Sequence, residues 1–256
     1  MDEATASVPA TPATERKMVL LAPWWHTVSL VALLLTVSYF SAGQLHAVSR
    51  KGDTMLLYAF TVIYEFILLG LVWLGVRSRG VSLPDLIGGK WVTLGDFFLD
   101  LAIAAGFWIV AVLVLASLGY LLGLGKGTAQ IDQAKKIIEM MAPRDALELM
   151  AFAGLSCVAG FCEEIIFRGY LQRQFGILSR NLWMGMFCSA AVFGLAHAYE
   201  GKQRMFIIAV YGAMFGSLAI LRKSLRPGMI AHAWHDSFQG GLLFFASRLL
   251  KSGVLK

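Results

Sequence analysis

Three short groups of ionisable residues interrupt apolar stretches in the second half of the chain. They are Glu163, Glu164 and Arg168 in CEEIIFRGYLQ, His197 in FGLAHAYE, and His232, His235 and Asp236 in AHAWHDSF. Ionisable side chains in such surroundings are costly in a membrane and are by default functional or paired. Carboxylates and imidazoles are also the groups that perform general acid–base catalysis. The three groups are therefore the first candidates for a site.

Helical spacing gives the first group two different roles. Glu164 and Arg168 are four residues apart, so they can pair along one face of a helix. Glu163 is rotated by about 100° from Glu164 around the helix axis. We therefore expect Glu164 and Arg168 to form a structural buried pair, while Glu163 faces a cavity.

The second and third groups repeat the same spacing. Phe193 and His197 are four residues apart, and so are His232 and Asp236. His235 lies near the face that His232 and Asp236 share. We interpret His235 as a helix-packing or interfacial histidine and place the chemistry on the other two.

Water activation is the chemistry that such a cluster supports. A carboxylate surrounded by apolar side chains holds a proton more tightly than one in water, which suits a general base. One imidazole could share the water or carry its proton. A second imidazole across the site could donate a hydrogen bond to a developing oxyanion.

The order of the motifs resembles a known family. EExxxR, FxxxH and HxxxN or HxxxD, on successive apolar helices, are the three motifs of the CAAX-protease and bacteriocin-processing (CPBP/ABI) family of intramembrane endopeptidases. Here they begin at Glu163, Phe193 and His232. The resemblance covers about residues 145–250, and we recognise no family in the first three predicted spans.

The resemblance implies a role for each motif residue. It assigns Glu163 and His197 to holding and activating the water, and His232 with Asp236 to the oxyanion side. Glu164 and Arg168 would be supporting residues. The departure is Asp236, where characterised prenyl-protein proteases carry Asn, because an ionised Asp cannot donate a hydrogen bond to an oxyanion.

Two other functions use the same groups. Glu163, His197, His232 and Asp236 could bind zinc in a metalloprotease, although HExxH is absent. A non-enzymatic proton or ion carrier, or a membrane scaffold, would also contain intramembrane acids and bases. The leading hypothesis needs no cofactor and has a membrane-embedded or lipid-anchored peptide as its substrate. The sequence leaves the oligomeric state open.

The elements that position these residues are membrane helices. Of 256 residues, 58% are hydrophobic and 15% are charged, whereas a soluble domain has about 25% charged residues. Lys and Arg are scattered among short loops, which favours anchoring at lipid headgroups over nucleic-acid binding. The sequence predicts an all-α polytopic bundle of about seven spans, at residues 24–45, 55–76, 96–124, 146–170, 182–199, 204–222 and 229–249. The third is long enough to tilt or break.

Composition divides the chain into four parts. We expect a disordered tail over residues 1–17, accessory helices over 18–144, a catalytic core over 145–250 and a C-terminal tail over 251–256. Lys and Arg are balanced between the two sides, so the N-terminus is placed inside only because the resemblance implies cytoplasmic access. Short loops and compact length favour a bacterial cytoplasmic membrane.

Outside the motifs, three acidic residues have to be assigned, and the depth of His232 in the membrane has to be reconciled with that of Glu163. We expect Glu65 to be a paired interior carboxylate, and Asp96 and Asp100 to lie at the head of a helix. In simple antiparallel spans, His232 would lie too shallow to meet Glu163. Either residues 222–230 dip into the protein, or residues 169–180 lie flat.

Overall fold

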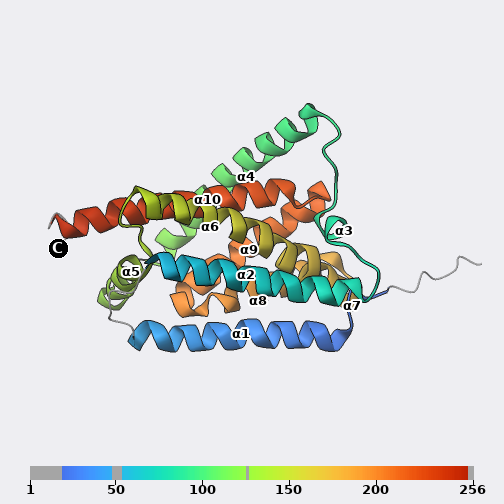
Figure 1. Cartoon of the computed structure of the whole chain (residues 1–256), viewed down its shortest axis with the longest axis horizontal. Helices are drawn as coiled ribbons and strands as arrows, with labels where there is room; N and C mark the ends of the chain where they lie inside the picture. Colours follow the sequence, from blue (N-terminus) through green and yellow to red (C-terminus); the bar gives the residue numbers. More distant parts are fainter. Residues whose placement is uncertain (1–18, 48–53, 125–126, 253–256) are drawn as a thin grey trace, which may run out of the picture.

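The computed structural model describes residues 19–47, 54–124 and 127–252, and every regular element in these ranges is a helix (Figure 1). The all-α prediction is confirmed. The predicted disordered tail, residues 1–17, and the last four residues of the predicted C-terminal tail lie outside the described ranges.

The predicted spans are all helical, and they account for most of the structure. The helices are α1 (Trp24–Ala47), α2 (Thr54–Arg77), α3 (Leu83–Ile87), α4 (Leu94–Leu121), α5 (Thr128–Met141), α6 (Ala146–Glu163), the π-helix η1 (Glu164–Leu171), α7 (Gln172–Ser179), α8 (Leu182–Ala196), the 3₁₀ turn η2 (Ala198–Glu200), α9 (Lys202–Arg222) and α10 (Arg226–Lys251). The sequence did not predict α3, α5 or the extension to Ser179.

Five helices in the described ranges are long and apolar enough to cross a membrane: α1, α2, α4, the continuous helix from Ala146 to Ser179, and α9. The remaining two predicted spans are α8, which has 15 residues, and the more polar α10, which has 26. The protein is an integral membrane protein, and the count of seven spans stays a prediction. The start of α1 and the end of α10 lie at opposite ends of the bundle, as an odd number of spans requires (Figure 1).

Helix α6 and its continuation form the centre of the bundle. Helix α10 packs along α6 and against α4, while α8 packs against both α7 and α9. Helix α4 is unbroken and lies oblique to its neighbours (Figure 1). At Gly160 on α6, an added Cβ would lie 2.9 Å from the backbone of Met229 and Ala233. This close approach brings α10 next to the glutamates at the end of α6.

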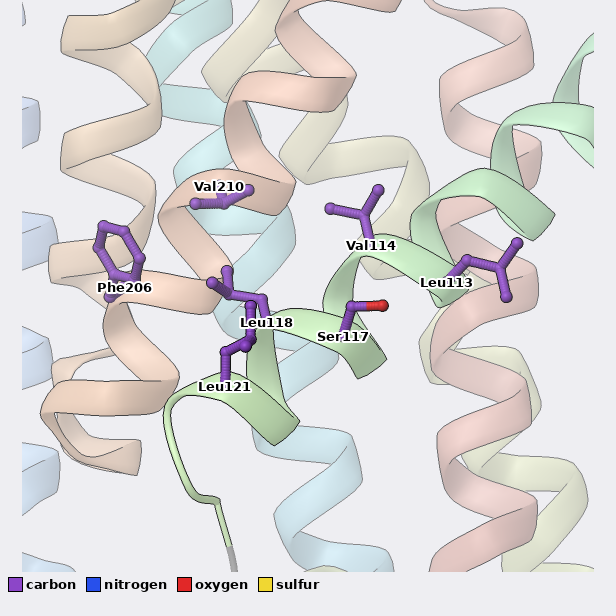
Figure 2. A pocket seen from close by; sticks show the side chains of 7 residues that line it. All are labelled: Leu113, Val114, Ser117, Leu118, Leu121, Phe206 and Val210. Atoms are coloured by element: carbon purple, nitrogen blue, oxygen red, sulfur yellow. The ribbon is translucent and has the colours of Figure 1, made fainter.

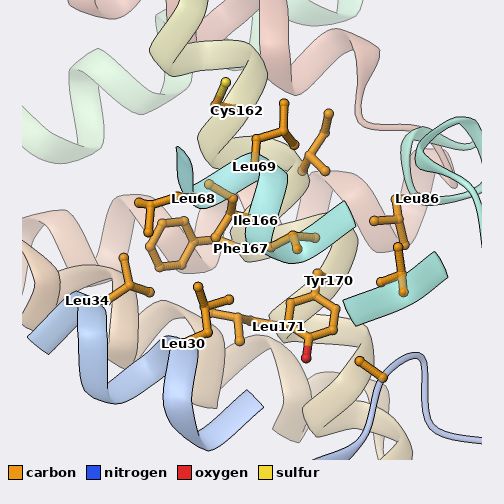
Figure 3. Close-up of a cluster of buried hydrophobic side chains, with 14 of the residues drawn as sticks. Leu30, Leu34, Leu68, Leu69, Leu86, Cys162, Ile166, Phe167, Tyr170 and Leu171 are labelled. Atoms are coloured by element: carbon orange, nitrogen blue, oxygen red, sulfur yellow. The ribbon is translucent and has the colours of Figure 1, made fainter. Parts of the chain in front are cut away.

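Buried apolar side chains from α1, α2 and η1 meet in the main core (Figure 3). Its central members are Leu30 and Leu34 of α1, Leu68 and Leu69 of α2, and Ile166, Phe167, Tyr170 and Leu171 of η1. Between lipid-embedded helices, close van der Waals packing replaces the hydrophobic effect as the main attraction. The first two spans therefore hold the segment that carries the EExxxR motif.

The turn between α9 and α10 dips into the protein, which reconciles the depth of His232 with that of Glu163. Leu225 is 1% exposed, and its backbone N–H donates to the Ile87 carbonyl at 2.8 Å. The Arg173 guanidinium donates to the carbonyls of Asp85 and Leu86, both at 2.8 Å, and holds α3 over this turn. The alternative, a flat segment over residues 169–180, is wrong because α6, η1 and α7 are one continuous helix.

The two acids near the start of α4 differ. Asp96 lies in the first turn and forms a capping box with Thr93, as a position at the helix head requires. Asp100 is buried one turn further on, where the helix dipole is weaker. It accepts hydrogen bonds from Arg222 Nε at 2.9 Å and Trp91 Nε1 at 2.8 Å. The prediction is therefore wrong for Asp100, which forms a tertiary ion pair.

Candidate active site

The EExxxR motif coincides with the π-helix. Glu164 opens η1 and Arg168 lies inside it, and π-turns in α-helices occur frequently at functional sites. Arg168 Nη1 lies 2.8 Å from Glu164 Oε1, and both side chains are about 98% buried or more. The Arg168 guanidinium also donates to the Gly212 carbonyl at 3.3 Å and lies 4.4 Å from the Phe193 ring centroid. The expected Glu164–Arg168 pair is therefore present, and it is buried from solvent.

His232 connects the two glutamates of the motif. Its Nδ1 lies 3.1 Å from Glu164 Oε1, so with a carboxylate acceptor Nδ1 is the donor. Its Nε2 lies 3.6 Å from Glu163 Oε2 and 3.6 Å from Asp236 Oδ2. The imidazole is also stacked on Phe215 with ring centroids 5.1 Å apart. Glu163, Glu164, His232 and Asp236 therefore form one cluster, although they come from two helices.

Exposure separates the members of this cluster. The side chains of Glu163 and Asp236 are 15% and 32% exposed, whereas those of Glu164 and His232 are 1% and 5% exposed. Glu163 and Asp236 are therefore the members of the cluster that are most open to a molecule from outside. We call the side of the cluster that Glu163 and Asp236 expose its open face; His232 is buried beneath these two carboxylates.

His197 ends α8 beside the cluster. Its Nδ1 lies 2.9 Å from the Phe193 carbonyl. A carbonyl only accepts, so the proton is on Nδ1, and Nε2 keeps a free lone pair in the neutral ring. The Phe193 ring lies 4.8 Å from the His197 ring and 6.3 Å from the His232 ring. Among the described residues no direct hydrogen bond joins His197 to Glu163, so a shared water or substrate would have to connect them.

Three further polar residues surround the cluster. His235 packs on the Tyr211 ring with centroids 4.7 Å apart, as expected for a helix-packing histidine. Glu65 interacts electrostatically with Glu163, His232 and Asp236, but its Oε2 is buried without a hydrogen-bond partner. The prediction that Glu65 is paired is therefore wrong within the described part of the chain. Neither Glu65 nor Tyr211 belongs to a sequence motif, and a single polar residue in an apolar helix gives no other signal.

In the described residues, no group of three or more His, Cys, Asp or Glu side chains is placed to hold a metal ion. A groove between α4 and α9 is lined by Leu113, Val114, Ser117, Leu118, Leu121, Phe206 and Val210 (Figure 2). None of these seven residues is titratable. The groove therefore contributes an apolar surface and no acid–base chemistry.

The comparison with known proteins agrees with the motifs. Residues 145–238 match the family model described as type II CAAX prenyl endopeptidase Rce1-like. The match includes every residue of the cluster and excludes α1 to α5. No curated protein and no solved structure matches the chain. Residues 145–238 are therefore similar to the Rce1-like type II CAAX prenyl endopeptidases, in agreement with the resemblance that the three motifs carry.

Proposed function

We propose that the protein is a glutamate-dependent intramembrane endopeptidase in which Glu163 is the general base. The observation that carries this proposal is the difference in exposure between the glutamates: Glu163 is on the open face, whereas Glu164 is sealed against Arg168. Glu163 takes a proton from a water molecule while the water oxygen bonds to the peptide carbonyl carbon. The C–N bond then breaks, and the same proton passes to the leaving amine.

His197 is the second group on the water in this proposal. With its proton on Nδ1, its Nε2 can accept a hydrogen bond from the water. His232 stabilises the far side of the reacting carbonyl, and Glu164 fixes its orientation through Nδ1. Asp236 Oδ2 lies 3.6 Å from His232 Nε2, which suits a role in holding the imidazole. As an ionised carboxylate, Asp236 has no proton to donate to an oxyanion.

A membrane-associated peptide is the proposed substrate. Glu163 and Asp236 are the partly exposed members of the cluster, and much of the outer surface of the bundle is apolar. A lipid anchor would concentrate a peptide at this depth, and the family description names CAAX prenyl endopeptidases. We place the protein in a bacterial cytoplasmic membrane.

Cleavage of a farnesylated CAAX peptide by purified protein in lipid nanodiscs tests the proposal. Mass spectrometry should detect release of the last three residues by wild type, and release by Glu163→Gln should be slower by about 100-fold or more. The same peptide without its farnesyl group separates prenyl-dependent from general peptidase activity. Metal analysis and a chelator identify a zinc enzyme. Cleavage that needs bound zinc would replace the glutamate-only mechanism, and absence of cleavage of any membrane peptide would leave a carrier or scaffold.

A further inference from the structure

Tyr211 of α9 has a buried hydroxyl with no hydrogen-bond partner. The residue is 5% exposed, and no acceptor or donor in the described structure meets its oxygen. Burying a hydroxyl without a partner costs free energy in proteins. Two other buried tyrosines avoid this cost: Tyr58 donates to the Met141 carbonyl at 2.6 Å, and the Tyr170 hydroxyl lies 2.8 Å from Thr27 Oγ1. A buried polar group without a partner needs an explanation, and beside a cluster of acids and bases a catalytic role is one such explanation.

The position of Tyr211 connects it to the cluster. Its ring centroid lies 6.2 Å from that of His232 and 4.5 Å from that of Phe215, the ring on which His232 stacks. The Tyr211 ring also packs on that of His235, the residue before Asp236, with centroids 4.7 Å apart. The Tyr211 side chain therefore lies beside the turn of α10 that carries His232, His235 and Asp236.

On that side of the cluster, the Tyr211 hydroxyl and His235 Nδ1 are buried groups without a partner among the described residues, whereas the other members are already engaged. Asp236 accepts only when it is ionised, and the Nδ1 proton of His232 is directed to Glu164. His232 can donate from Nε2 only when the ring is doubly protonated, and Nε2 then faces two carboxylates, Glu163 and Asp236. A carbonyl oxygen that becomes negative here needs a neutral donor that no carboxylate has already engaged.

We infer that Tyr211 is a catalytic residue whose hydroxyl donates a hydrogen bond to the oxyanion, the role that Asp236 cannot fill. The inference rests on the endopeptidase function proposed above. No bond to the tyrosine forms or breaks, because its proton stays on oxygen and stabilises the negative charge until the C–N bond cleaves. In this proposal the hydroxyl has no partner among the described residues because its acceptor is the reacting carbonyl.

Tyr211→Phe removes the hydroxyl alone, and Tyr58→Phe is the matched control at a buried tyrosine whose hydroxyl has a partner. Tyr211→Phe should lower kcat by about 100-fold or more, the usual effect of removing one oxyanion donor. KM should stay unchanged, and the melting temperature in detergent should be equal to or above that of wild type. Tyr58→Phe should do the opposite, with a lower melting temperature and an unchanged kcat per folded molecule.

The Asp236→Asn variant provides a second test of the inference. An amide restores a donor beside the carbonyl, so Tyr211→Phe should reduce kcat less in the Asp236→Asn background than in wild type. Full activity in Tyr211→Phe, or equal reductions in both backgrounds, would overturn the inference while leaving the endopeptidase intact. If wild type itself cleaves no peptide, the proposed function fails instead, and the two failures are thus distinguishable.

Discussion

Glu164 and His232 are joined through a single oxygen atom. Glu164 Oε1 lies 3.1 Å from His232 Nδ1 and also accepts from Arg168 at 2.8 Å. The carboxylate is therefore shared between a buried ion pair and the imidazole beneath the open face. The Glu164–Arg168 pair and the active-site cluster therefore form one network, so a change in the pair should alter both the stability of the protein and the orientation of His232.

Arg168→Ala should destabilise the protein strongly. It leaves Glu164 without its cation in a buried place, and removing one partner of a buried pair costs about 3–5 kcal/mol. Arg204→Ala is the matched control, because the Glu200–Arg204 pair has the same spacing but is 19% and 44% exposed. Such a pair contributes at most about 1 kcal/mol. Unfolding in detergent measures both; equal stabilities of the two variants would show that the buried pair is solvated.

Replacing both partners separates the two duties of Glu164. Glu164→Leu with Arg168→Met removes the charges together, so part of the stability lost in Arg168→Ala should return. Activity should not return with it, because His232 has lost the acceptor of its Nδ1 proton. Melting temperature and peptide cleavage are measured on the same preparations. Recovery of both would mean that Glu164 serves only the ion pair.

Gly160→Ala should separate α10 from α6. Its Cβ would lie 2.9 Å from the Met229 carbonyl oxygen and the Ala233 nitrogen, which are backbone atoms that cannot turn aside. Gly154→Ala on the same helix is the control, since nothing lies within 4 Å of its Cβ. We expect reduced activity for the first variant only. For the second, helix propensity predicts unchanged or slightly greater stability, by up to about 1 kcal/mol. Equal activity in both would show that the spacing of the two helices does not control the site.

The helices could be predicted because the solvent of the chain is lipid. Long apolar runs in a membrane have to be helical, so the spans follow from composition and punctuation alone. Helix α5 was missed because its mixed polar sequence between spans is also typical of a loop. The π-helix was missed because apolar periodicity does not distinguish a local i→i+5 turn from an α-helix.

The members of the cluster could be predicted from their order on successive helices, but their contacts could not. His232 meets Glu164 across 68 positions of sequence, and Arg222 meets Asp100 across 122. Such contacts depend on where helices cross, which in this protein is set by close approaches such as that at Gly160. Glu65, whose Oε2 has no hydrogen-bond partner among the described residues, is a related example, because a missing partner cannot be recognised in the sequence.

The seven-span topology predicts which loops share a side of the membrane. Gln203 Nε2 donates to the Leu122 carbonyl at 3.0 Å, so the loop after α4 and the start of α9 lie together. Single cysteines at the exposed positions Lys136 and Lys202 should react from the same side, and one at Arg180 from the other. Cys157 and Cys188 are exposed and must first be replaced with serine. Labelling of Lys136 and Lys202 from opposite sides would change the number of spans.

Glu163 and His197 should behave as one unit. Glu163→Gln keeps the size of the side chain but removes its basicity, so kcat should fall by about 100-fold or more, the lower range for a general base. His197→Ala should give a comparable loss, and the double variant should be scarcely worse than either, because both residues act on one water. All three variants should still fold, as measured by their melting temperatures.

Glu164→Gln is the control for the neighbouring carboxylate, and its loss of activity should come with a loss of stability through Arg168 and His232. An active, stable Glu163→Gln beside an inactive, stable Glu164→Gln would exchange the roles of the two glutamates, and full activity in both would end the water-activation mechanism.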